Sequence, residues 1–244
     1  MTQAIERETD GAPDEVVGVL TETKSAIELN GILDHPGSPY FAAPDFLHME
    51  PIESLHLIRH FETKQQETNY NCGCACVWMV MNHFGFATHD ERTIEGHFDQ
   101  ISTRGTNAYD LKRFFESIGW TVECHADTRL KFHSLEELET YLIERIDHDI
   151  PVMVDWLDWG GHWQVAIGLD TMGTDNALDD VLIMADPYDV TDHCQDGYYV
   201  VSLARFFRMW REGHGSYGQP PFEQPYLVAV PPNHGSAALV GPCS

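Results

Sequence analysis

The sequence predicts an α+β fold in which helices precede an antiparallel β-sheet. Apolar residues recur at helical spacing in segments between residues 72 and 149, whereas β-branched and aromatic residues fill short runs between residues 151 and 230. The chain has 244 residues, of which 43% are hydrophobic, so it can bury a substantial core. We therefore expect a single folded domain in which a helical part packs on a sheet.

A helix is predicted to begin at Cys72. Asn71 is the expected N-cap and Gly85 the expected stop. Apolar side chains recur along this segment at steps of three and four residues, at Cys76, Met79, Val80, His83 and Phe84. The pattern predicts a buried helix whose first turn stays open. Upstream, the alternation in SLHLIRHF (54–61) predicts a strand that leads toward this helix.

Three further helices and one strand follow. Residues 91–101 and 108–119 have helical spacing, and WTVEC (120–124) then reads as a short strand. The segment 134–149 begins with Ser134 and Glu137 at the spacing of a capping box, and Pro151 fixes its end.

The second half of the chain is rich in strands. Four runs contain many β-branched and aromatic residues and are divided by turn-prone segments: PVMVDWL, HWQVAIGLD, DVLIMAD and GYYVVS. They predict an antiparallel sheet. A helix in ARFFRMWREG (204–213) and a strand in YLVAV (226–230) complete the order. The expected organisation is an extension over residues 1–35, a domain over 36–230 and a tail over 231–244.

Composition limits the partners and the location of the protein. The 39 acidic and 14 basic residues give a formal charge of -25, which would repel nucleic acid and anionic membrane surfaces. The N-terminus has no basic start or apolar run, and no later stretch is long and apolar enough to span a membrane, so we expect a cytoplasmic protein. The six cysteines are then expected to be reduced thiols rather than disulfides. No cofactor and no set of metal ligands is predicted.

Cys72 is the candidate nucleophile. A thiolate is favoured at a helix N-terminus, where aligned N–H dipoles stabilise negative charge. Gln66, six residues earlier, is the candidate side-chain donor for an oxyanion. Among the 14 histidines, His162 follows two glycines and begins an apolar strand, so its imidazole can point outward from the end of that strand. Asp186 ends the next strand before Pro187 and can orient that imidazole if the two strands are adjacent.

These residues resemble the papain-like cysteine peptidases, and specifically the branch that trims double-glycine leaders from bacteriocin precursors. The shared features, in order, are Gln66, the Cys72-Gly73 pair that opens a helix, the Gly161-His162 pair that starts a strand, and Asp186-Pro187. The resemblance covers roughly residues 55–230, and the ordered set is far more specific than any one of its parts. It implies a two-lobed fold, with the Cys72 helix in one lobe and the sheet carrying His162 and Asp186 in the other.

The implied activity is that of a cysteine peptidase acting on a peptide or protein. Cys72 would attack the carbonyl carbon, His162 would protonate the leaving amine, and Asp186 would orient His162. Gln66 and the Cys72 backbone N–H would bind the oxyanion. Two features depart from the family pattern. The chain has no membrane span or ATP-binding motif of a fused transporter, and Cys74 stands where relatives commonly carry proline or a small residue.

Alternatives remain open for several residues. Trp159, Gly161 and Trp163 are candidate substrate contacts, but the two tryptophans have an equal claim to be core aromatics. Cys74 and Cys76 are more consistent with structural thiols, since alternate helical positions cannot direct all three sulfurs of CGCAC to one metal. The aspartates of the 170–180 turn favour a solvated surface over a calcium site.

Two other functions compete with hydrolysis. The same acyl-enzyme could pass its acyl group to an amine or thiol, as in a transferase. In a different class, the chain could be a non-enzymatic, thiol-rich module that binds metal or a partner protein through CGCAC and its acidic surface.

Overall fold

The computed structural model describes residues 44–86, 89–98, 105–125, 132–157, 161–190, 194–210 and 223–234. The expected N-terminal extension, most of the expected tail and Trp159 lie outside the described residues. Within them, no helix is both long enough and apolar enough to cross a membrane.

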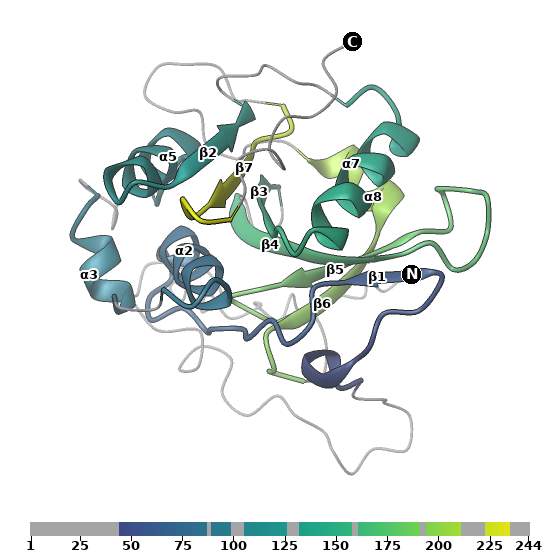
Figure 1. Ribbon diagram of the computed structural model, residues 1–244, viewed down its shortest axis with the longest axis horizontal. Coiled ribbons are helices and arrows are strands. Elements are labelled where there is room, and N and C mark those ends of the chain that lie inside the picture. The colour runs from purple at the N-terminus through teal and green to yellow at the C-terminus, as the bar shows by residue number, and fades with distance from the viewer. Residues whose placement is uncertain are drawn as a thin grey trace, which may run out of the picture.

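Within the described residues, a seven-stranded antiparallel sheet forms the centre of the fold (Figure 1). Its strands are β1 (Leu55–Leu57), β2 (Thr121–Cys124), β3 (Val152–Trp156), β4 (His162–Asp170), β5 (Val181–Ala185), β6 (Tyr198–Ser202) and β7 (Tyr226–Val230). The spatial order is β2-β7-β3-β4-β5-β6, and β1 pairs with the far end of β4. All pairings are antiparallel, as the sequence predicted.

Helices pack on this sheet to give an α+β fold. The described helices are η2 (Phe46–His48, a 3-10 turn), α2 (Cys72–His83), α3 (Glu91–Glu95), α5 (Ala108–Ser117), α7 (Leu135–Asp147) and α8 (Leu203–Met209). Figure 1 shows α2, α3 and α5 gathered on one side of the molecule and α7 and α8 on the other. The predicted α+β arrangement, in which the Cys72 helix packs on an antiparallel sheet, is confirmed.

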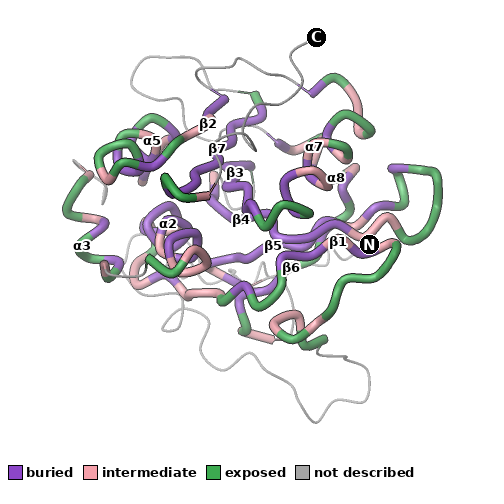
Figure 2. Tube along the Cα trace, in the orientation of Figure 1, coloured by how far each residue is buried: buried purple, intermediate pink, exposed green. Residues whose placement is uncertain are grey.

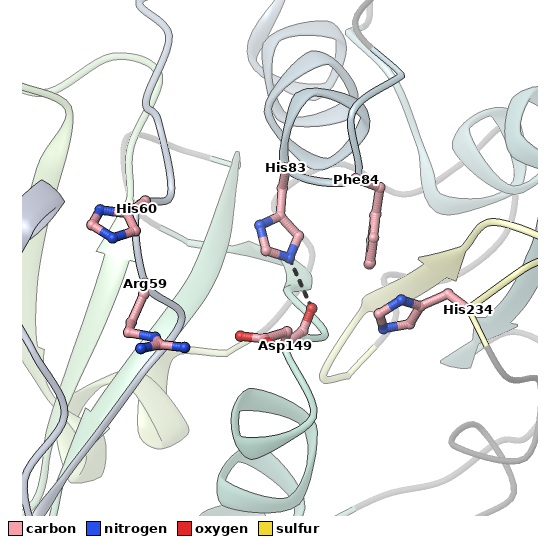
Figure 3. Close-up of a pocket in the computed structure, with 6 residues that line it drawn as sticks. All are labelled: Arg59, His60, His83, Phe84, Asp149 and His234. Atoms are coloured by element: carbon pink, nitrogen blue, oxygen red, sulfur yellow. Dashed lines mark hydrogen bonds between the residues drawn. The ribbon is translucent and has the colours of Figure 1, made fainter.

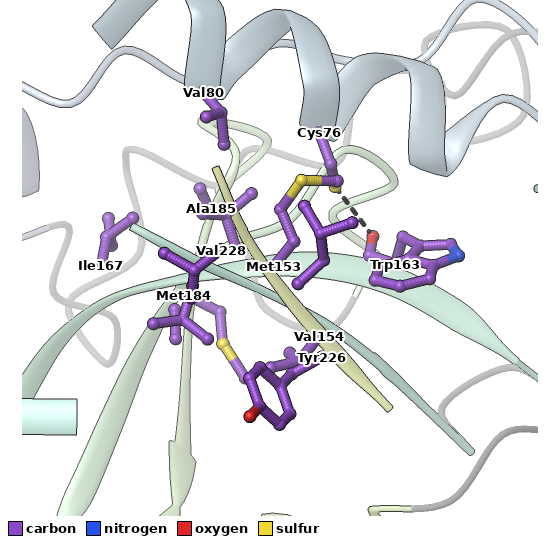
Figure 4. Close-up of a cluster of buried hydrophobic side chains, with 14 of the residues drawn as sticks. Cys76, Val80, Met153, Val154, Trp163, Ile167, Met184, Ala185, Tyr226 and Val228 are labelled. Atoms are coloured by element: carbon purple, nitrogen blue, oxygen red, sulfur yellow. Dashed lines mark hydrogen bonds between the residues drawn. The ribbon is translucent and has the colours of Figure 1, made fainter. Parts of the chain in front are cut away.

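Helix α2 lies deep in the structure, packed against β4. Most of its residues are buried, and Trp78 and the two ends of the helix are partly exposed (Figure 2). The Cys76 thiol donates a hydrogen bond to the backbone oxygen of Trp163 in β4, over 3.3 Å (Figure 4). Because so little of α2 reaches water, the position of its first turn is fixed by core packing.

Aromatic side chains connect the other side of the sheet to α7 and α8. The Tyr226 ring of β7 lies 5.7 Å from Tyr141 of α7, and the Trp156 ring of β3 lies 5.3 Å from Phe206 of α8, centroid to centroid. The Trp156 indole also donates to the Gln164 side chain over 2.6 Å. Trp156 is therefore a core residue.

The helix boundaries follow from local hydrogen bonds. Ser134 caps α7 by accepting from the Glu137 N–H over 3.3 Å. The Glu137 carboxylate accepts from the His133 N–H rather than from Ser134, so the predicted capping box is displaced by one residue. Asn71 occupies the N-cap position of α2, but its side chain makes no capping bond. Gly85 follows the end of α2 with a φ of 78°, which favours glycine.

Gly168 lies where β4 is paired on both edges and where its register with β5 shifts. A Cβ atom at this position would come within 2.7 Å of Leu57 Cδ1 and 3.1 Å of Ile183 Cδ1. Side chains from both neighbouring strands therefore fill the space beside the glycine.

We expect Gly168→Ala to lower the free energy of unfolding by about 1–3 kcal/mol, because β1 and β5 must move apart to admit the methyl group. Chemical denaturation of the variant measures this loss. Gly96→Ala is the matched control, since its nearest new contact is an ordinary 3.4 Å. Equal stability of the two variants would contradict the proposed close packing.

Candidate active site

Cys72 is the first residue of α2 and is only partly buried. The first N–H groups of a helix have no partner within the helix, so they concentrate positive potential at this thiol. The rest of α2 is held in the core. The structure thus presents one thiol at a partly open helix N-terminus, as the sequence predicted.

The antiparallel pairing of β4 and β5 brings His162 and Asp186 together. His162 begins β4, Asp186 follows β5, and the register aligns Val165 with Ala185 near these ends. His162 Nε2 lies 2.7 Å from Asp186 Oδ1. An ionised carboxylate can only accept, so Nε2 carries the proton and donates. Both side chains are buried, with exposed fractions of 5% for His162 and 0% for Asp186.

Electrostatics favour the charged forms of this pair. Burial alone would lower the pKa of His162, but the charge of Asp186 and the hydrogen bond to it raise the pKa well above its usual value. Burial would raise the pKa of Asp186, but His162 and backbone N–H groups hold it below its usual value. The buried imidazolium and carboxylate therefore stabilise each other.

The imidazole also contacts the nucleophile. A hydrogen bond and a favourable charge interaction with Cys72 contribute to the raised pKa of His162. Because Nε2 is bonded to Asp186, Nδ1 is the nitrogen left for the thiol. His162 thus lies between Cys72 and Asp186. A cysteine and a histidine placed in this way can supply a nucleophile and a proton donor.

The turn after β5 holds Asp186 in place. Asp186 N donates to Gly197 O over 2.8 Å, and its Oδ1 accepts from Tyr188 N over 2.8 Å. Asp189 closes the turn by accepting from Gly197 N over 2.6 Å. Sequence analysis assigned Asp189 no role. The available signal was its place three residues after Asp186 in a DPYD turn, where aspartate side chains commonly bond backbone N–H groups.

Gln66 lies against the same turn. Its backbone N–H donates to Pro187 O over 2.8 Å, and its side chain is only 2% exposed. The side-chain Nε2 donates to Thr68 O over 2.5 Å. An amide nitrogen has two hydrogens, so this bond fixes the carboxamide and leaves one donor. The loop between Gln66 and Cys72 is thus tied to the residue that follows Asp186.

Gly73 and Thr106 determine how closely α2 approaches β4. A Cβ atom on Gly73 would lie 1.9 Å from Thr106 Oγ1 and 3.4 Å from the Trp163 ring. The Trp163 indole donates to Thr106 O over 3.0 Å and is 2% exposed. Trp163 therefore packs beneath the Cys72 helix, which favours the core reading among its two predicted roles. Thr106 escaped sequence analysis because only tertiary packing places it beside Gly73.

Gly161 directly precedes His162 and has a φ of 123°, a conformation that favours glycine. It is partly exposed at the beginning of β4. A side chain here would strain the backbone that positions the imidazole. Gly161 therefore remains a candidate for close approach by a substrate, together with Trp159 outside the described residues.

The other thiols of CGCAC are structural. Cys74 and Cys76 are fully buried, and burial raises the pKa of both well above its usual value. The segment is helical, so its three sulfurs diverge as the sequence argument required. No group of three or more potential ligands in the described part of the chain is arranged to hold a metal ion.

The aspartates of the 170–180 turn serve local structure. Asp179 accepts from the side chains of Thr174 and Asn176, over 3.2 Å and 3.3 Å. Asp170 accepts from Met172 N over 2.8 Å. Asp180 is buried, and burial followed by its acidic neighbours raises its pKa to about 6. The contacts of Asp170 and Asp179 fit the predicted surface turn, whereas the buried Asp180 departs from it.

A pocket of about 610 Å³ lies at the opposite end of α2 (Figure 3). Its lining consists of Arg59, His60, His83, Phe84, Asp149 and His234. His83 donates from Nε2 to the backbone oxygen of Asp149 over 2.9 Å. Since His83 ends the helix that Cys72 begins, this pocket is separate from the catalytic residues.

Comparison with known proteins gives one family match and one similar solved structure. Residues 60–153 match the model of the Peptidase C39 family, a segment that contains Gln66 and Cys72 and ends before His162. No curated protein matches the chain. Among solved structures, the chain is similar to the peptidase domain of Streptococcus ComA, described as a bi-functional ABC transporter involved in quorum sensing. The identity is 16% and the TM-score 0.41, and the match covers 70% of this chain and 97% of that chain.

Over residues 60–153 the chain is therefore similar to a family of cysteine peptidases. More particularly, it is similar to the C39 peptidases, the branch that the order of Gln66, Cys72, His162 and Asp186 indicated.

We expect Gly73→Ala to reduce peptidase activity at least tenfold, because the added methyl group collides with Thr106 and displaces the first turn of α2. The double variant Gly73→Ala/Thr106→Gly removes the collision and should recover part of the activity. Initial rates of the two variants measure the effect. A double variant no more active than Gly73→Ala would contradict this explanation.

We expect Asp186→Asn to shift the alkaline limit of activity to lower pH. Without the carboxylate charge, burial dominates and lowers the pKa of His162, so the imidazolium loses its proton at a lower pH. The pH profile of kcat/KM measures the shift. An unchanged alkaline limit would show that Asp186 does not support the charge on His162.

Proposed function

We propose that the protein hydrolyses a peptide or isopeptide bond through a thioester acyl-enzyme on Cys72. The observation that supports this most directly is the position of His162 between Cys72, at the start of α2, and Asp186, whose Oδ1 lies 2.7 Å from His162 Nε2. This arrangement combines a nucleophile at a helix N-terminus, a buried acid–base group and a carboxylate that orients it. The proposed substrate is a peptide or protein.

Acylation begins with the Cys72 thiolate. Its sulfur attacks the carbonyl carbon, and the Cys72 N–H and the remaining Gln66 amide hydrogen donate to the oxyanion. The C–N bond then breaks while His162 transfers its proton to the leaving amine. Asp186 keeps the imidazole in the tautomer that presents Nδ1 to the sulfur. The product of this half-reaction is a Cys72 thioester and a free amine.

Deacylation reverses the proton transfers. Neutral His162 removes a proton from water as the water oxygen attacks the thioester carbonyl. The C–S bond breaks, the acid product leaves, and the thiolate and imidazolium are restored. Gly161 and Trp159 are the residues that we assign to substrate contact, because they directly precede His162 in the chain.

The two alternative functions predicted from the sequence, an acyl transferase and a thiol-rich binding module, are not equally supported. Acyl transfer to an amine uses the same four residues, so it differs from hydrolysis only in the acceptor. The thiol-rich metal module has less support because two of its three sulfurs are buried in the helix core. The cytoplasmic location stays a prediction from sequence.

We expect iodoacetamide to label Cys72 faster than any other cysteine, because this partly exposed thiol lies at the N-terminus of α2 beside His162. Mass spectrometry should find that Cys72→Ala removes the fast label and that His162→Ala slows it at least tenfold. Cys194→Ala is the matched control, since Cys194 is also a partly exposed free thiol. Equal labelling of all cysteines would contradict a catalytic Cys72.

The same samples distinguish hydrolysis from transfer. A fluorogenic peptide-amide library incubated with and without an added amine should give the free acid as the main product. A conjugate with the amine as main product would favour the transferase. Cleavage retained by Cys72→Ala would exclude both reactions at this site.

A further inference from the structure

A buried carboxylate lies beside the loop that joins Gln66 to Cys72. Glu91 is the first residue of α3, and its side chain is 0% exposed. Buried glutamate is uncommon unless it has partners, because removing the charge from water is costly. Neither the reaction nor the sequence pattern assigns a role to this residue, so its contacts are informative.

Each contact of Glu91 reaches the segment that precedes the nucleophile. Its Oε1 accepts from the backbone N–H of Glu67, the residue after Gln66, over 2.9 Å. Its Oε2 lies 3.8 Å from Lys64 Nζ, which in turn lies 5.4 Å from the Trp78 ring of α2. One buried side chain thus connects the loop to the helix on which the loop packs.

Helix α3 also holds the end of the loop that leads into Cys72. Asn71, directly before Cys72, is fully buried and donates from Nδ2 to Glu95 Oε2 over 3.1 Å. Burial raises the pKa of Glu91, although the Glu67 N–H, Asn71 and Lys64 lower it. Two glutamates of α3 therefore fix the loop at Glu67 and at Asn71.

Gln66 has little freedom between these fixed points. Its own N–H is bonded to Pro187, its side chain to Thr68, and the next N–H to Glu91. Loss of the Glu91 bond would leave the Glu67 N–H without its buried acceptor and release the peptide that follows Gln66. The carboxamide would then move relative to the Cys72 sulfur. A displacement of about 1 Å at such a group can cost about 100-fold in rate.

We propose that Glu91 is a positioning residue for the oxyanion site: it fixes the peptide between Gln66 and Glu67 so that the Gln66 carboxamide faces the substrate oxygen. This role rests on the proposed function of Gln66 and Cys72. Glu91 acts through the loop and does not touch the reacting atoms. Its loss should therefore weaken steps that form an oxyanion and spare steps that do not.

Two reactions of the same thiol separate these effects. Cleavage of a fluorogenic peptide amide passes through an oxyanion, whereas alkylation by iodoacetamide is a displacement at saturated carbon and forms none. We expect Glu91→Ala to lower kcat for cleavage about 10- to 100-fold and to change KM and the alkylation rate of Cys72 less than about threefold. Glu91→Gln keeps an oxygen acceptor for the Glu67 N–H and should recover most of the loss.

The matched control is Glu67→Ala. It removes an exposed carboxylate paired with Arg92 but keeps the backbone N–H that Glu91 holds, so its kcat should equal that of the unaltered protein. Gln66→Ala should lower kcat about 100-fold, and adding Glu91→Ala to it should cost less than about threefold more. Such non-additivity is expected if Glu91 acts through Gln66.

Hydrogen exchange gives a readout independent of catalysis. Amide protection over residues 66–71 should fall in Glu91→Ala and be retained in Glu91→Gln, with thermal stability checked for each variant. Equal losses of cleavage and alkylation, multiplicative effects in the double variant, or unchanged protection would each overturn the positioning role. Turnover in the unaltered protein that does not depend on Cys72 would instead overturn the proposed function and this role with it.

Discussion

The packing of α2 against β4 is the constraint on which the rest of the site depends. The helix begins at Cys72 and the strand begins at His162, so their contact brings the proposed nucleophile and the proposed base together. Gly73 permits the close approach of α2 and β4, because Thr106 fills the space that a side chain at position 73 would need. One turn farther along α2, the Cys76 thiol donates a hydrogen bond to the backbone of β4. Since this interface is buried and tightly packed, the separation of sulfur and imidazole is a property of the core. The loops that carry Gln66 and Asp186 complete the site.

Charge at the site is maintained by burial combined with pairing. His162 and Asp186 would each lose their charge if buried alone, yet together they favour imidazolium and carboxylate. The turn that carries Asp186 is fixed by Asp189 and Gly197, and the same turn receives the backbone of Gln66 through Pro187. The β4–β5 pairing, the His162–Asp186 pair and the loop from Gln66 to Cys72 are therefore linked by hydrogen bonds. A substitution that displaces one of them is expected to displace the others.

Local patterns predicted most of the secondary structure because periodicity and turn residues act over short distances. The strand from His162, the strand before Asp186 and the helix after Ser134 all begin or end within a residue or two of their predicted bounds. Predictions were weaker where a residue had two local readings. Trp163 fits either a cleft wall or a core, and only the neighbouring Thr106 and Gly73 make it a core residue. Asn71 is a residue type that commonly caps helices, but its side chain donates a hydrogen bond to Glu95 of α3 instead.

By itself the sequence determined the α+β class, the helix that opens at Cys72 and the ordered set of Gln66, Cys72, His162 and Asp186. Those features follow from residue type and spacing, which act along the chain. The tertiary structure alone decided that Trp163 supports the helix and that Glu91 and Asp189 hold the two loops of the site. These roles come from contacts between segments distant in sequence. Such contacts depend on packing and desolvation, and no spacing rule encodes them.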